Sequence, residues 1–223
     1  MNSLDNILEI HPYSIGKYMI IDSSSRRNLE LVETLREKQK RGSLLWVLDK
    51  TRTAMGARLL RTYVEQPLIE KAEIIKRQKL IEALNANEIT RDEIREYLNP
   101  IYDLERLITR ITYQSANPRD LIAFRDSLKM LPPIKQQLSD IPCELTDEIN
   151  EEFDELKDIY ELLLSSIEDE PPISQRDGDI IKAGYNEEVD RLRDAKTKGK
   201  TWLAELEAGE REKTGIKKLK NQV

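Results

Sequence analysis

The chain has 223 residues, of which 36 are Lys or Arg and 42 are Asp or Glu, so its formal net charge is −6. A single cysteine and a single histidine exclude an internal disulfide and the multi-cysteine and paired-histidine motifs that hold zinc. No stretch approaches the roughly 20 apolar residues of a membrane span, and the first residues lack the basic and apolar regions of a signal peptide. We therefore expect a cytoplasmic chain without a membrane partner.

Helical periodicity dominates from about residue 43 onward. Before it, the apolar run Tyr18–Ile21 predicts one short N-terminal strand, followed by a turn. Ser43 and Thr53 are the predicted N-caps of two short helices, the second of which ends before Pro67. Further helices are predicted over 71–84, 88–98 and 103–112.

The second half of the chain predicts three longer helical segments. Asn117 and Pro118 predict a helix start, because Asn is a favoured N-cap and proline is favoured at the first helical position. That helix ends or is interrupted at Leu131-Pro132-Pro133. A long acidic helix from Thr146 is predicted to carry a coiled-coil-like seam of Ile149, Phe153, Leu156, Tyr160, Leu163 and Ile167. A final helix from about Asp177 carries Ile181, Tyr185, Val189, Leu192, Leu203 and Leu206.

Charge is distributed unevenly along this half. Residues 144–170 hold twelve acidic side chains and one base, Lys157, so this segment is not expected to lie on DNA. In the final helix the segment Lys196–Thr201 replaces the apolar stripe with cations, hydroxyls and a glycine. We therefore expect residues 178–195 to dock on the body of the protein and the rest to project as an arm.

No motif supports catalysis by this chain. Gly199-Lys200-Thr201 matches the end of a P-loop, but Asp194 stands where that loop needs its first glycine. The lone His11 has no evident orienting partner, and nothing selects a catalytic pair among the 42 acids. The sequence therefore predicts no catalytic, cofactor-binding or metal-binding residue.

A possible nucleic-acid surface lies earlier in the chain. Seven cations fall within 24 residues: Lys38, Lys40, Arg41, Lys50, Arg52, Arg58 and Arg61. Glu33, Glu37, Asp49 and Glu65 are interspersed among them. A basic patch and a surface of acid-paired cations are both open interpretations, and the second is favoured.

Six strings, in order, closely resemble the core domain of the bacterial MutS family of DNA mismatch-recognition ATPases. They are DSSSRRNLEL at 22–31, GSLLWVLDKTRTAMGARLL at 42–60, DLERL at 103–107, NPRDL at 117–121, RDGDIIKAGYNEE at 176–188 and EREKTGIKKLK at 210–220. The resemblance covers the chain from about residue 18 to its end. Phe153-Asp154-Glu155 spells the family's Phe-x-Glu mismatch motif, but its place in the acidic helix argues against that role.

The resemblance implies an all-α fold, a multi-helix core with a long projecting lever helix. Residues 1–21 would lead in from a preceding connector, 22–176 form the core domain, 177–195 the lever helix and 196–223 the truncated outgoing part of a DNA clamp. The fragment would be non-catalytic and would couple the clamp to an ATPase domain elsewhere in the parent protein. Hypothetical DNA phosphate contacts are Lys196, Lys198, Lys200, Lys217, Lys218 and Lys220.

The resemblance also implies partners for the parent protein: mismatched duplex DNA, the other MutS domains, a second MutS subunit, MutL, and ATP with Mg²⁺ as cofactors. The fragment itself is expected either to fray beyond Lys196 or to self-associate through its arm. Two alternatives stay open. One is a helical protein-interaction scaffold that docks a partner on the seam from Ile149 to Ile167. The other is an independent nucleic-acid-binding module that uses the cations from Lys38 to Arg61.

Overall fold

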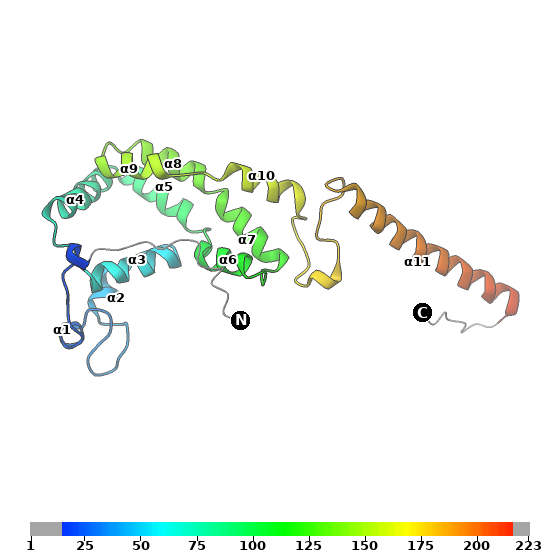
Figure 1. Cartoon of the computed structure of the whole chain (residues 1–223), viewed down its shortest axis with the longest axis horizontal. Coiled ribbons are helices and arrows are strands. Elements are labelled where there is room, and N and C mark those ends of the chain that lie inside the picture. The colour runs from blue at the N-terminus through cyan, green and yellow to red at the C-terminus, as the bar shows by residue number, and fades with distance from the viewer. Residues whose placement is uncertain (1–14, 216–223) are drawn as a thin grey trace, which may run out of the picture. The chain divides into compact units, whose positions relative to one another are not determined.

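The computed structural model describes residues 15–215, and this part of the chain is helical (Figure 1). Eleven α-helices lie within it: α1 (Ser23–Asn28), α2 (Leu44–Leu48), α3 (Ala54–Glu65), α4 (Lys71–Ala86), α5 (Glu88–Leu98), α6 (Leu104–Thr112), α7 (Pro118–Leu128), α8 (Leu131–Ser139), α9 (Glu144–Glu152), α10 (Lys157–Ser166) and α11 (Glu187–Thr214). The predicted all-α fold with a long helix is thereby confirmed. None of these helices is both long and apolar enough to cross a membrane.

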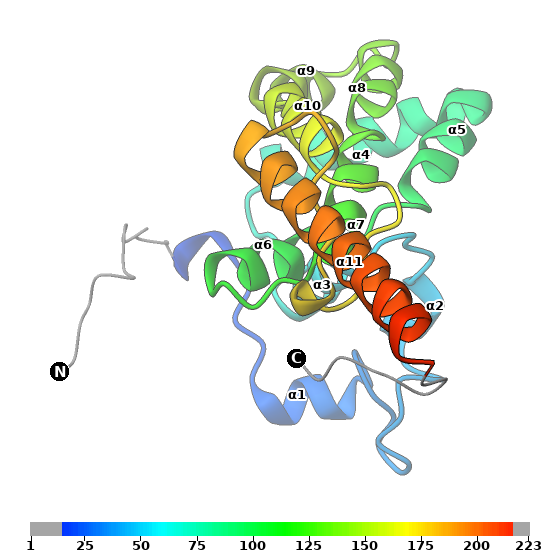
Figure 2. The same ribbon diagram turned by 90° about the vertical axis from the view of Figure 1, so that its right-hand side faces the viewer.

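The chain forms two compact units. Among the described residues, the first unit comprises 15–116 and 123–157, and the second comprises 117–122 and 158–215. In the first unit α4 packs against α5 and α9, and α8 packs against the same two helices, as both views show (Figures 1 and 2).

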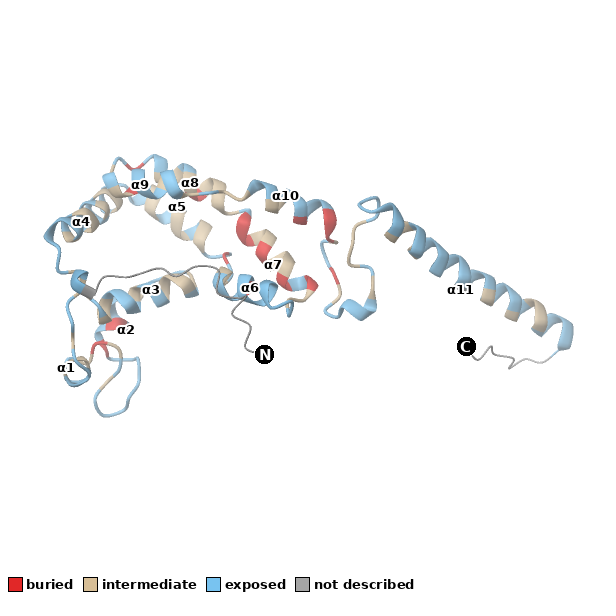
Figure 3. Ribbon diagram, in the orientation of Figure 1, coloured by how far each residue is buried: buried red, intermediate tan, exposed pale blue. Residues whose placement is uncertain are grey.

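The core of the first unit is apolar and its buried hydroxyls are satisfied. Leu128 and Ile141 are each only 1% exposed, and most of the buried residues drawn on α7 belong to this unit (Figure 3). The hydroxyl of buried Ser127 donates to the Ala123 carbonyl over 2.7 Å and accepts the Tyr102 backbone N–H over 3.0 Å. Thr146 donates to the Ile141 carbonyl over 2.7 Å. These bonds remove the cost of burying hydroxyl groups in an apolar core.

Three predicted helix starts are confirmed by their hydrogen bonds. Ser43 accepts the Trp46 N–H over 3.2 Å, and Thr53 accepts the Gly56 N–H over 3.0 Å. Asn117 accepts the Asp120 N–H over 2.9 Å, while the Asp120 carboxylate accepts the Asn117 N–H over 2.8 Å. This reciprocal pair satisfies two backbone donors at the start of α7.

One prediction for the short segments needs correction, whereas the predicted interruption at Leu131-Pro132-Pro133 is confirmed and gains detail. Tyr18–Ile21 forms no strand. Tyr18 makes a single isolated β-bridge to Leu68. On either side of it, the Met19 N–H donates to the Pro67 carbonyl and the Ile69 N–H donates to the Lys17 carbonyl. The prolines at 132 and 133 do not merely end a helix, because they occupy the first turn of α8, where a missing N–H costs nothing.

The predicted acidic helix is two helices. α9 ends at Glu152 and α10 begins at Lys157, so Phe153 and Leu156 lie between them. The Asp154 carboxylate accepts the Leu156 N–H over 2.9 Å, Leu156 takes a left-handed φ of 51°, and Lys135 of α8 donates to the Phe153 carbonyl over 2.6 Å. The turn formed by the Asp154 side chain and the hydrogen bond from Lys135 thus replace helical backbone hydrogen bonds. The prediction of one continuous apolar seam is therefore wrong.

The final helix starts ten residues later than predicted. α11 begins at Glu187, and its N-cap Asn186 accepts the N–H groups of Glu188 and Val189 over 3.0 and 3.1 Å. Ile181 and Tyr185 therefore precede the helix. The helix continues unbroken past residue 195 to Thr214, and the two alternatives of fraying beyond Lys196 and self-association stay predictions. The division into lever and clamp segments at that residue stays a prediction.

Candidate nucleic-acid interface

α11 has one stretch without acidic side chains. Between Asp194 and Glu205 the charged residues are Lys196, Lys198 and Lys200, whereas acids are frequent on either side. Lys196 and Lys198 are exposed, and the Lys198 ammonium lies 4.0 Å from the Asp194 carboxylate. Both side chains of this pair are more than 70% exposed, so the pair is weak. This part of α11 can therefore present cations to an anionic partner.

Of the other four predicted phosphate contacts, one lies within the described part of the chain. Lys200 lies in α11, and Lys217, Lys218 and Lys220 lie outside the described residues. Gly199-Lys200-Thr201 falls in the middle of α11, where backbone N–H groups are engaged in helical bonds and cannot cradle phosphates. The residues at this position do not fit the phosphates of a nucleotide.

The base of α11 is tied to the rest of the second unit by Arg193. Its Nη2 donates to the Ile181 carbonyl over 2.7 Å, its Nη1 lies 3.1 Å from the Asp190 carboxylate, and its Nε lies 3.4 Å from the Asp179 carboxylate. The second oxygen of Asp190 accepts the Gly184 N–H over 2.7 Å. One guanidinium thus joins the second turn of α11 to the segment that precedes it.

That preceding segment is itself paired with the end of α10. Ile181 and Ile167 form an antiparallel β-bridge. In it the backbone N–H of Glu168 donates to the Ile180 carbonyl, and the backbone N–H of Lys182 donates to the Ser166 carbonyl, each over 2.9 Å. The Lys182 ammonium also donates to the Leu164 carbonyl in the last turn of α10 over 3.0 Å. Ile167 is only 5% exposed. A chain of bonds therefore runs from α10 through this bridge to Arg193 and α11.

Three of the seven cations from Lys38 to Arg61 are paired with acidic neighbours: Lys40, Arg58 and Arg61. Lys40 pairs with Asp49, and its hydrogen bond, with that of Thr51, lowers the pKa of Asp49 to about 2. Arg61 pairs with Glu65 over 3.2 Å. Lys38, Arg41, Lys50 and Arg52 have no ion pair with any described residue, so the acid-paired interpretation applies to three of the seven cations.

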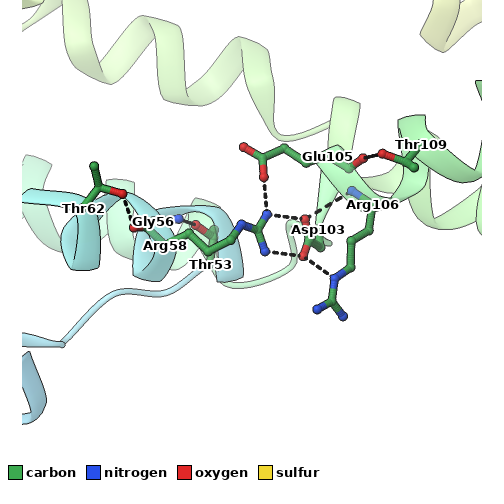
Figure 4. A network of polar contacts seen from close by, with 8 residues as sticks. All are labelled: Thr53, Gly56, Arg58, Thr62, Asp103, Glu105, Arg106 and Thr109. Atoms are coloured by element: carbon green, nitrogen blue, oxygen red, sulfur yellow. Dashed lines mark hydrogen bonds and ion pairs between the residues drawn. The ribbon is translucent and has the colours of Figure 1, made fainter. Parts of the chain in front are cut away.

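Arg58 is committed to a structural network (Figure 4). Its guanidinium binds the Asp103 carboxylate through two parallel 2.7 Å bonds and also pairs with Glu105. Asp103 is the N-cap of α6, and its Oδ1 accepts the Arg106 N–H over 3.4 Å. The Arg58 hydrogen bond lowers the pKa of Asp103 below its ordinary value. A bidentate pair of this kind fixes α3 against the start of α6.

Other candidate features give no site. No group of three or more His, Cys, Asp or Glu side chains within residues 15–215 is arranged to hold a metal ion. The seam of the scaffold alternative is interrupted between α9 and α10, and its last two members, Leu163 and Ile167, are buried. Trp46, whose apolar surroundings in the sequence predict a core position, is 46% exposed.

Comparison with known proteins agrees with this fold. A family model described as MutS domain III matches residues 24–223. The DNA mismatch repair protein MutS of Lachnoclostridium phytofermentans is 64% identical over 219 residues, which are 98% of this chain and 24% of that protein. The protein of the same name from Ruminiclostridium cellulolyticum is 50% identical over 218 residues, 98% of this chain and 25% of that protein. The chain thus spans about a quarter of the length of these relatives.

Proposed function

Because this chain belongs to the MutS domain III family, we propose that it is the non-catalytic core and lever segment of a DNA mismatch-recognition ATPase. In this role it couples a DNA clamp at the far end of α11 to an ATPase domain elsewhere in the parent protein. ATP and Mg²⁺ bind in that other domain. The parent acts on mismatched duplex DNA in the cytoplasm, as a dimer and with MutL.

The observation that supports this proposal best is the length and exposure of α11 together with its attachment at one end. It has 28 residues, hence a length of about 42 Å, and its described residues are exposed or half-buried (Figure 3). Asp190 and Arg193, in its first two turns, tie it to the segment that precedes it. A rigid element held at one end transmits a change in direction over its whole length, as a lever must.

The charge pattern of α11 supports contact with DNA along the part of the helix that follows its first two turns. Acids occupy the first turn, where they interact with the positive end of the helix dipole, and the cations at 196, 198 and 200 follow. We propose that these lysines face DNA phosphates, together with Lys217, Lys218 and Lys220.

Salt dependence of DNA binding tests this assignment. In a full-length MutS whose domain III is this chain, Lys196, Lys198 and Lys200 are replaced together by Gln. If all three contact phosphates, the slope of log K against log salt falls in magnitude by about 3, because each contact contributes about 0.9. Three exposed lysines of the first unit, Lys71, Lys79 and Lys129, serve as the control set. An unchanged slope in the α11 variant, or an equal loss in the control, would contradict the proposal.

A further inference from the structure

Three arginines converge on one open hollow in the first unit. The hollow is lined by Arg52, Asn85, Arg91, Asp92, Arg95 and Glu96. Arg52 comes from the linker between α2 and α3, Asn85 from the end of α4, and the remaining four from α5. Residues separated by more than 40 positions in the chain are thus brought together at one surface point.

The carboxylates at this hollow do not neutralise all three arginines. Arg91 donates to the Asn85 side-chain oxygen over 3.3 Å and lies 3.5 Å from Asp92. Glu96 accepts a bond from the Asn99 amide over 3.1 Å. Neither the Arg52 nor the Arg95 side chain has a hydrogen bond or ion pair with any residue in the described part of the chain. The N–H donors of these two guanidinium groups are therefore available to a ligand.

The hollow has an excess of one positive charge, because three guanidinium groups stand against the two carboxylates of Asp92 and Glu96. Arg91 and Arg95 are four residues apart on α5 and lie on the same helix face, where like charges repel. Arg52 adds a third positive charge from another element. Arg95 is also half-buried, so water screens its charge less than that of a fully exposed side chain.

We infer that this hollow binds a phosphate group. A phosphate carries up to two negative charges and several acceptor oxygens, which match guanidinium forks approaching from two elements. The Asn85 bond holds the Arg91 fork in place, while Arg52 and Arg95 supply free donors. The phosphate comes either from the backbone of duplex DNA or from a free nucleotide. The inference does not depend on the lever role of α11.

Titration with inorganic phosphate tests the site directly. The ¹⁵N-labelled chain is titrated at constant ionic strength, with chloride as the balancing anion, and the arginine Nε–H resonances are followed by NMR. The site predicts saturable shifts of Arg52 and Arg95. Replacing either residue by Gln should weaken binding about tenfold, because a bond to a charged group contributes that much.

Two further variants separate the site from general charge and from misfolding. Arg41→Gln removes an exposed cation from the same region but outside the hollow, and should leave phosphate affinity unchanged. Arg95→Lys keeps the charge without the fork and should bind with intermediate affinity. Non-saturable shifts, or an equal loss in Arg41→Gln, would overturn the inference.

Competition then identifies the source of the phosphate. Displacement of phosphate by a short duplex but not by ADP assigns the site to the DNA backbone. The reverse result assigns it to a nucleotide. Either result supports a phosphate site, provided that Arg52→Gln and Arg95→Gln weaken the competitor as well.

Discussion

Arg193 donates to the Ile181 carbonyl over 2.7 Å, and this bond joins the second turn of α11 to the segment paired with the end of α10. The same guanidinium contacts Asp190 and Asp179. Arg193 is 29% exposed, so its interactions are partly shielded from water. If α11 is a lever, its direction is set by this contact.

Loss of the Arg193 contacts should loosen the base of α11. Arg193→Gln removes the charge and two of the three interactions, so we expect faster hydrogen exchange at the amides of Glu168 and Lys182, which form the bridge, and through the first two turns of α11. Arg191→Gln is the matched control, since Arg191 is exposed and has no polar partner among the described residues. Equal exchange in the two variants would mean that Arg193 does not position the helix.

The two roles of Asp103 can be separated by substitution. Asp103→Asn keeps a good N-cap side chain but loses the charge that binds Arg58, whereas Asp103→Ala loses both. We expect the Ala variant to be less stable than the Asn variant by about 1 kcal/mol, the usual contribution of a cap. Urea unfolding of both variants measures this difference. Identical midpoints would show that the cap contributes nothing.

The ion pair of Asp103 should give a defined pH dependence. Because Arg58 lowers the pKa of Asp103 in the folded state, the contribution is present above the unfolded-state pKa of about 3.9 and is lost as pH falls through the lowered value. The stability difference between the wild type and Asp103→Asn should thus be constant near neutral pH and shrink below about pH 4. Urea midpoints across this range provide the test. A difference that grows with acidity would refute it.

Buried Leu128 and exposed Leu192 should respond differently to the same substitution. Leu128 is 1% exposed, so Leu128→Ala should cost about 2–5 kcal/mol of unfolding free energy. Leu192 on α11 is 62% exposed, and Leu192→Ala should change stability by less than about 1 kcal/mol. Chemical denaturation measures both. A large loss in the second variant would place Leu192 in a contact that this structure lacks.

Local sequence signals predicted several helix starts. Ser43, Thr53 and Asn117 cap helices where their side-chain chemistry indicates, because capping bonds form between residues two or three apart. The break at residues 153–156 was not predictable from periodicity. The apolar residues on both sides of the break are spaced as in a continuous helix. The hydrogen bond that Lys135 donates at the break comes from another helix, α8.

The candidate site was predicted only in part. The lysines of α11 are visible as a change in composition, but the role of Arg193 is not, because its shortest bond is to a backbone carbonyl that any residue at 181 would offer. The arginine hollow was likewise hidden, since Arg52 meets Arg91 and Arg95 only after α4 and α5 have folded. Tertiary contacts of this kind leave no periodic signal.

A helix break in α11 tests the lever role most directly. In a full-length MutS whose domain III is this chain, Ala195→Pro interrupts α11 just beyond its anchor, and Ala195→Leu keeps the helix intact. The measurement is ATP hydrolysis with and without saturating mismatched duplex. We expect the proline variant to lose stimulation by DNA but to keep its rate without DNA, and the leucine variant to behave as the wild type. Full stimulation in a folded proline variant would contradict the coupling role of α11.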